Sequence, residues 1–270
     1  MIANVLSIAG SDPSGGAGIQ ADLKTFSALG AYGMAVITAL TAQNTQEVRS
    51  FQTVDPEFVA EQIDAIFADV RVDAVKIGMV ATAEIATAVA NRLRHHGARN
   101  IVLDPVMVAK SGHHLLREDA VAALRDTLVP IARVITPNLP EAGVLIGEPP
   151  PVTPEDMQRV VRELHRLGAE WVLLKGGHLT GDDSTDLLFD GKATTELPGR
   201  RIDTRNTHGT GCTLSAAIAA LLPRFEMVEA VRRAKAYLAG AIAASDRLTV
   251  GSGHGPVHHF HALWKEGAAQ

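Results

Sequence analysis

The most informative stretch of this 270-residue chain is Asn206-Thr207-His208-Gly209-Thr210-Gly211-Cys212-Thr213, which is small, polar and punctuated by glycines. It runs directly into the alanine-rich segment 214–222, whose composition is helical. A loop that enters a helix in this way gathers free backbone N–H groups at the positive end of the helix dipole, which favours an anion. Glycine lets the backbone approach a phosphate group, and a thiol near a helix start is more readily ionised. The stretch suggests phosphoryl transfer; a helix start with a buried cysteine is the alternative.

On either side of this stretch, short apolar runs alternate with segments of helical period. The strands are predicted at Val5–Ala9, Met34–Thr41, Val48–Val54, Ala74–Ile77, Ile101–Leu103, Val134–Ile135, Trp171–Leu174, Thr185–Phe189 and Ala193–Leu197. The helices are predicted at Ala17–Leu29, Pro56–Phe67, Ala83–His95, Glu118–Leu128, Leu139–Ile146, Pro154–Leu167, Thr213–Leu222 and Met227–Arg247. This alternation predicts an α/β fold with a mainly parallel sheet covered by helices on both faces. Because the rhythm continues across the proline-rich connector at 147–151, we expect a single domain over residues 1–270.

Composition excludes several classes of protein. The net charge is −5, from 25 basic and 30 acidic residues without a basic stripe, so no nucleic-acid partner is expected. A single cysteine fits a reducing compartment. The N-terminus lacks a basic leader, and no apolar run reaches about 18 residues, so no membrane span is expected. We therefore expect a cytoplasmic protein whose core, at 46% hydrophobic and 4% aromatic residues, is built mostly from aliphatic side chains.

Polar residues follow several of the predicted strands. They are Gln43 with Asn44, Asp104, Asn138 with Glu141, and Lys175. In open α/β sheets, ligands bind beyond the carboxyl ends of the strands, so these residues are expected to share one site. Asp104 and Glu141 could hold Mg²⁺, which typically takes one or two carboxylates and substrate phosphates. Taken singly, each has an ordinary alternative, namely a turn at Asp104, a first-turn charge at Glu141 and a solvated Lys175.

Other motifs are weaker than they first look. Residues 16–21 match the dinucleotide pattern G-x-G-x-x-A, but six residues separate the predicted strand from Gly16 and the expected acidic residue is missing. No P-loop motif occurs. The histidines of the segment 254–261 lack the spacing and partners of a zinc site, so we interpret them as structural.

Seven stretches in this order resemble the ribokinase superfamily, and within it the bacterial hydroxymethylpyrimidine/phosphomethylpyrimidine kinases of thiamine biosynthesis. These stretches are Ile8 to Asp22, Thr38 to Thr45, Lys76 to Met79, Asp104 to Met107, Thr136 to Glu141, Lys175 to His178 and Asn206 to Thr213. The segment 255–261 is similar to the family as well. The resemblance implies a ribokinase-like fold, an ATP- and Mg²⁺-dependent kinase, a pyrimidine substrate that is phosphorylated twice, and a homodimer.

The resemblance also implies a role for individual residues. The anion hole comprises Gly209, Thr210, Gly211 and Cys212, with Cys212 as general base where many sugar kinases have aspartate. The metal ligands are Asp104 and Glu141, and the nucleotide phosphates are approached by Lys175, Asn138 and Thr210. The pyrimidine is bound by Gln43, with Asp22 and Gly10 nearby and Met79 and Val106 packed on the ring.

Two alternatives remain open at this stage. One is a pyridoxine or pyridoxal kinase of the same superfamily, and the other is a catalytically silent relative that binds the ligand. A Gln43 amide offers a donor and an acceptor together, which matches the amine and ring nitrogen of an aminopyrimidine. Residues 108–112 are the predicted lid, from their small polar composition after a strand end.

Overall fold

The structure, a computed structural model, describes residues 1–107, 118–179, 181 and 183–264. The predicted lid at 108–112 lies outside these residues. The described strands are β1 (Asn4–Ala9), β2 (Tyr32–Ile37), β3 (Ala39–Gln43), β4 (Val48–Thr53), β5 (Ala74–Ile77), β6 (Ile101–Leu103), β7 (Val134–Ile135), β8 (Trp171–Leu174), β9 (Asp186–Phe189) and β10 (Thr194–Leu197). The described helices are α1 (Gly18–Ala28), α2 (Pro56–Asp69), α3 (Ala83–His95), α4 (Glu118–Ala123), α5 (Leu139–Ile146), α6 (Pro154–His165), α7 (Thr210–Leu221) and α8 (Met227–Ala243). Shorter turns of helix are η1 (Leu124–Leu128), η2 (Val129–Ile131) and η3 (Ser245–Arg247).

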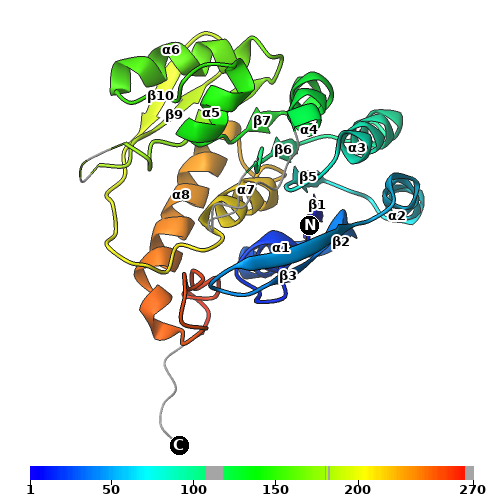
Figure 1. The fold of residues 1–270 in the computed structure, drawn as a ribbon, viewed down its shortest axis with the longest axis horizontal. Helices are drawn as coiled ribbons and strands as arrows, with labels where there is room; N and C mark the ends of the chain where they lie inside the picture. The colour runs from blue at the N-terminus through cyan, green and yellow to red at the C-terminus, as the bar shows by residue number, and fades with distance from the viewer. Residues whose placement is uncertain (108–117, 180, 182, 265–270) are drawn as a thin grey trace, which may run out of the picture.

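Within the described residues, the main sheet has the strand order β10-β9-β8-β7-β6-β5-β1-β2. The six strands from β8 to β2 are mutually parallel, while β9 runs antiparallel to both β8 and β10. Two layers of helices enclose this sheet (Figure 1). One aliphatic cluster packs α2, α3, α5 and α6 against one face, and a second packs α7 and α8 against the other. The predicted mainly parallel α/β fold is therefore confirmed.

The register of the parallel strands brings their carboxyl ends to a common edge. Ile8, Ile77, Leu103, Ile135 and Val172 are paired in sequence across β1, β5, β6, β7 and β8. The segments that follow these five strands therefore leave the sheet along this one edge. This alignment positions the site.

The predicted strand Met34–Thr41 is wrong in one respect, because it is two strands in two different sheets. β2 ends at Ile37, and the buried Thr38 donates its hydroxyl to the Met79 carbonyl at 2.6 Å. The chain then leaves the main sheet as β3, which pairs with β4 in a separate antiparallel ribbon. Periodicity could not reveal this break, since Thr38 is as compatible with a strand as its neighbours are. The predicted exposed position of the Val48 strand is confirmed, because most of β4 is exposed.

The other boundaries differ by a few residues. The Asp190-Gly191 hairpin is confirmed by the antiparallel pairing of β9 with β10. α7 begins at Thr210, three residues earlier than predicted, because Gly209 adopts φ = 77° and serves as the N-cap. No helix among the described residues is long and apolar enough to span a bilayer.

Candidate active site

A cavity of ≈ 1310 Å³ opens where the carboxyl ends of the parallel strands meet the start of α7. The predicted site residues that line it are Gly10, Gln43, Met79, Val106, Asp104, Asn138, Glu141, Lys175, Gly209, Thr210, Gly211 and Cys212. Asp22 does not line it, because this residue is fully buried behind the cavity wall. Most of the predicted site residues therefore come together in one cavity, although they are spread over most of the chain.

The start of α7 lines the cavity with the predicted anion loop, Gly209 to Cys212. Its N-cap, Gly209, offers no side chain to the first-turn N–H groups. The Thr210 N–H donates to the Thr207 carbonyl, so the Gly211 and Cys212 N–H groups are the ones that a ligand could take. A Cβ on Gly209 would lie 1.8 Å from the Gly16 carbonyl oxygen, so glycine is needed for contact as well as for its positive φ. A Cβ on Gly211 would lie 3.4 Å from Asp104 Oδ2 and 3.5 Å from Lys175 Nζ. The predicted anion loop thus lies against the predicted metal and phosphate residues.

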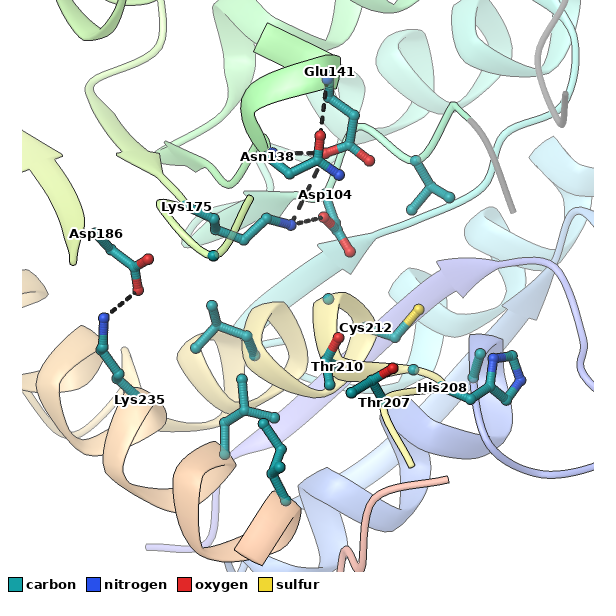
Figure 2. A pocket seen from close by; sticks show the side chains of 18 of the residues that line it. Asp104, Asn138, Glu141, Lys175, Asp186, Thr207, His208, Thr210, Cys212 and Lys235 are labelled. Carbon is teal, nitrogen blue, oxygen red and sulfur yellow. Dashed lines mark hydrogen bonds and ion pairs between the residues drawn. The ribbon is translucent and has the colours of Figure 1, made fainter. Parts of the chain in front are cut away.

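Asp104 is buried and is held by three side chains. Its Oδ1 lies 3.2 Å from Lys175 Nζ and accepts the Thr136 hydroxyl at 3.2 Å, while Oδ2 accepts the Ser215 hydroxyl at 3.3 Å. Two of these donors directly follow β8 and β7 and the third is in α7, so together they fix the carboxylate in one orientation. Figure 2 shows Asp104 and Lys175 across the cavity from Thr210 and Cys212.

Glu141 combines a structural role with a place in the cavity. Its Oε2 accepts the Asn138 backbone N–H at 2.8 Å, and the Asn138 side chain accepts the Glu141 N–H at 2.8 Å, which forms a capping box at the start of α5. The same Oε2 lies 3.9 Å from Lys175 Nζ. Burial raises the pKa of Glu141 to about 7, despite the opposing effect of the Lys175 ammonium. Glu141 therefore lies in the first turn of α5, as its ordinary alternative role required, and it also lines the cavity.

Two carboxylates beside a lysine fit Mg²⁺ as it binds in phosphoryl-transfer enzymes, where substrate phosphates and water complete its coordination. Asp104 and Glu141 come within 3.2 and 3.9 Å of the same Lys175 nitrogen, so a cation and phosphate oxygens could share this space. In the described part of the chain, no three His, Cys, Asp or Glu residues are grouped as an all-protein metal cage. The tail histidines agree with this, since His258 and His259 are buried and His259 Nε2 lies 3.1 Å from the Thr213 hydroxyl oxygen.

Cys212 differs from the expectation drawn from its place near a helix start. Burial raises the pKa of its thiol to about 11, although Lys76 opposes the shift. Asp22 and Asp104 raise this pKa further. The prediction of a readily ionised thiol is therefore wrong, because burial, with a smaller contribution from the two aspartates, raises the pKa of Cys212 despite the helix start.

Another part of the cavity is lined by the residues predicted to bind the pyrimidine ring. Gln43 ends β3, and Met79 Sδ lies 3.2 Å from where a Cβ on Gly10 would be. Two residues here were not singled out from the sequence. His208 Nε2 lies 2.8 Å from Asp12 Oδ2 and 3.4 Å from Gln43 Nε2. Both belong to motifs that carried the resemblance, but their pairing spans 196 positions and leaves no local signal.

The glycine loop at the start of α7, the acid–lysine cluster and the Gln43 region line one cavity, an arrangement that suits a kinase acting on a small molecule. A sequence model of the family described as phosphomethylpyrimidine kinase matches residues 12–258. The hydroxymethylpyrimidine/phosphomethylpyrimidine kinase of Rhizobium meliloti strain 1021 is 58% identical, over 98% of this chain and 100% of that protein. A thiamine biosynthesis bifunctional protein of Geobacter sulfurreducens is 51% identical, over 96% of this chain and 52% of that protein.

Solved structures agree with the sequence matches. The ADP complex of Bacillus subtilis pyridoxal kinase superimposes with a TM-score of 0.90 at 38% identity, covering 98% of this chain and 100% of that one. The chain belongs to the phosphomethylpyrimidine kinase family, and it is an ATP-dependent phosphotransferase of ribokinase-like fold.

Proposed function

We propose that this chain transfers a phosphoryl group from ATP to 4-amino-5-hydroxymethyl-2-methylpyrimidine, and then a second one to the monophosphate, in thiamine biosynthesis. The observation that carries the proposal is the α7 anion loop lying against Asp104 and Lys175, with the Gln43 pocket in the same cavity. The family match and the named activity of the Rhizobium relative support the substrate. In each transfer the acceptor oxygen bonds to the γ-phosphorus, the bond from that phosphorus to the bridging oxygen breaks, and ADP leaves.

The site residues divide into a nucleotide side and an acceptor side. Lys175, Asn138 and Thr210 are proposed to contact the nucleotide phosphates. The pKa of Lys175 is lowered by burial but raised more by Asp104 and Glu141, so it stays charged. Asp104 and Glu141 would hold Mg²⁺, which would neutralise developing charge on the phosphate oxygens.

On the acceptor side, Gln43 is proposed to bind the amine and ring nitrogen of the pyrimidine. Gly10, Met79 and Val106 would pack on its ring. Asp22 would support the pyrimidine site from its buried position behind the cavity wall. Cys212 is proposed to accept the hydroxyl proton as a thiolate, which its raised pKa makes a minor form at neutral pH.

The remaining proposals concern the whole protein. A single domain over residues 1–270 is supported by one main sheet with a core on each face. A homodimer and a cytoplasmic location are proposed from the same family resemblance, and the biosynthetic bacterial relatives support the latter.

The similarity to a pyridoxal kinase makes pyridoxine the second candidate substrate. A coupled assay of ADP release with purified protein, ATP and Mg²⁺ separates the candidates. We expect the hydroxymethylpyrimidine to give a higher kcat/KM than pyridoxine, since Gln43 can pair with both groups of the pyrimidine edge. Each group left unpaired in a buried site costs roughly 1–3 kcal/mol. A higher kcat/KM for pyridoxine would replace the proposal, and no ADP release with either alcohol would favour a silent binding protein.

A further inference from the structure

Lys76 is a buried cation that lines the active-site cavity from β5. Its Nζ lies 2.8 Å from Asp22 Oδ2 on α1, and neither side chain is exposed. Asp22 Oδ2 also accepts the Ser7 hydroxyl, whereas Oδ1 has no hydrogen-bond partner among the described residues. The pair therefore lies between the core of the sheet and the site of phosphoryl transfer.

The Lys76 ammonium has hydrogen-bond donors to spare. An ammonium group carries three N–H donors, and among the described residues only Asp22 is bonded to that of Lys76. Lys235 lines the same cavity and provides a contrast, because its Nζ donates to the Ser184 carbonyl at 2.9 Å, to Asp186 at 2.7 Å and to the Leu197 carbonyl at 2.7 Å. Protein groups therefore saturate Lys235, while Lys76 keeps two donors for a group that enters the cavity.

Stability does not account for this arrangement. Removing two charges from water is costly, and a buried pair can often be replaced by uncharged side chains of similar volume without loss of stability. An ammonium with unused donors adds to that cost. Burial lowers the pKa of Lys76, but Asp22, Cys212 and Asp104 raise it more, so the group is charged at neutral pH. A permanent positive charge at this position therefore points to a ligand.

The geometry assigns this charge to the acceptor side of the site. A Cβ on Gly78 would lie 2.7 Å from Lys76 Nζ and 3.1 Å from the Ala9 Cβ. Nζ therefore lies beside the ends of β1 and β5, where Gly10 and Met79 continue into the ring pocket. Lys175 approaches the cavity from β8 instead, beside Glu141. The two lysines thus line the cavity from different places, Lys76 from β5 and Lys175 from the residue that follows β8.

We propose that Lys76, held by Asp22, is the acceptor-side cation of the site and donates hydrogen bonds to the oxygens of the acceptor during transfer. The inference rests on the proposed function, in which the acceptor is first a neutral alcohol and then a phosphate monoester. A fixed positive charge stabilises a dianionic acceptor more than a neutral one. Lys76 therefore contributes most to the second phosphorylation, and Asp22 is a positioning residue for it.

The test compares the two acceptors in three proteins, namely the unmodified chain, the charge-free pair Lys76→Met/Asp22→Asn and the charge-retaining Lys76→Arg. The kcat/KM for each acceptor is measured with saturating ATP and Mg²⁺, and urea unfolding is measured alongside. For the charge-free pair we expect a loss of about 100-fold with the alcohol, as for removal of one transition-state donor. We expect a further loss of about tenfold or more with the monophosphate, and smaller losses for Lys76→Arg with both acceptors.

The ratio of the two kcat/KM values keeps the test decisive even if a variant is partly unfolded, because both rates scale with the folded fraction. A charge-free pair that keeps the unmodified ratio overturns the inference, as does one whose activity stays within about threefold for both acceptors. Lys76 would then be structural. In both cases the unmodified enzyme still turns over its substrates, so the proposed function survives. Turnover of neither acceptor by the unmodified chain would instead overturn the function, and this inference with it.

Discussion

Replacing Glu141 by Gln is expected to stabilise the metal-free protein above neutral pH while it removes much of the response to Mg²⁺. Glutamine also serves in a capping box, so the bond from the Asn138 N–H can survive the change. Burial raises the pKa of Glu141 from 4.5 to about 7. A difference of about 2.5 corresponds to about 3 kcal/mol, by which folding disfavours the ionised side chain. The protonated Glu141 therefore favours folding. Its contribution to the free energy of unfolding is fully present below about pH 4.5 and is lost as the pH rises through 7.

The measurement is urea unfolding with EDTA between pH 4.5 and 8.5. The free energy of unfolding of the variant should match that of the unmodified chain near pH 4.5 and exceed it by roughly 1–3 kcal/mol at pH 8, allowing for relaxation around the charge. Asp156→Asn is the matched control, since Asp156 is also the third residue of a capping box but is only partly buried. Hydrogen bonds from Val152 and Thr153 lower its pKa. Its variant should lose stability at pH 8. Parallel pH curves for Glu141→Gln and the unmodified chain, or normal turnover with a normal Mg²⁺ titration, would refute the reasoning.

Three further substitutions test the other parts of the site. If the Cys212 thiolate accepts the proton, kcat/KM should rise about tenfold per pH unit from 7 to 10, because burial raises the pKa of this thiol to about 11. Cys212→Ala should lower kcat/KM by about 100-fold or more and abolish the rise with pH. A flat profile, or a loss below tenfold, would remove Cys212 from proton transfer. Gln43→Leu should narrow the preference for the pyrimidine over pyridoxine by lowering the pyrimidine kcat/KM by at least about tenfold, and an unchanged ratio in competition assays would exclude Gln43 from ring selection. Gly209→Ala should weaken ATP binding measured by calorimetry, because its Cβ would lie 1.8 Å from the Gly16 carbonyl oxygen and φ is +77°; unchanged affinity would argue against the anion loop.

The sequence predicted the layered architecture because each β/α unit carries its own signal. Apolar runs such as Ile101–Leu103 are local signals, and so are the residues that follow each strand. Once a parallel sheet is inferred, the strand ends must converge. Asp104 and Lys175 could therefore be expected at one site although 71 positions separate them.

What the sequence could not supply depends on contacts between distant segments. The break at Thr38 follows from its bond to Met79, 41 positions away. The spare donors of Lys76 follow from the burial of a pair 54 positions apart. The pKa of Cys212 is another example. The helix start could be predicted from the sequence, but the burial and the acidic neighbours that raise the pKa of this thiol could not.

The most direct test of the proposed double phosphorylation follows the phosphorus products of the reaction over time. The purified protein is incubated with Mg²⁺, excess ATP and the hydroxymethylpyrimidine, and ³¹P NMR records each phosphate species. If the chain phosphorylates the pyrimidine twice, we expect a monophosphate ester to form first and then to convert to the diphosphate, with two ADP released per pyrimidine consumed. Accumulation of the monophosphate with one ADP per pyrimidine, or ADP release without a phosphorylated pyrimidine, would contradict it.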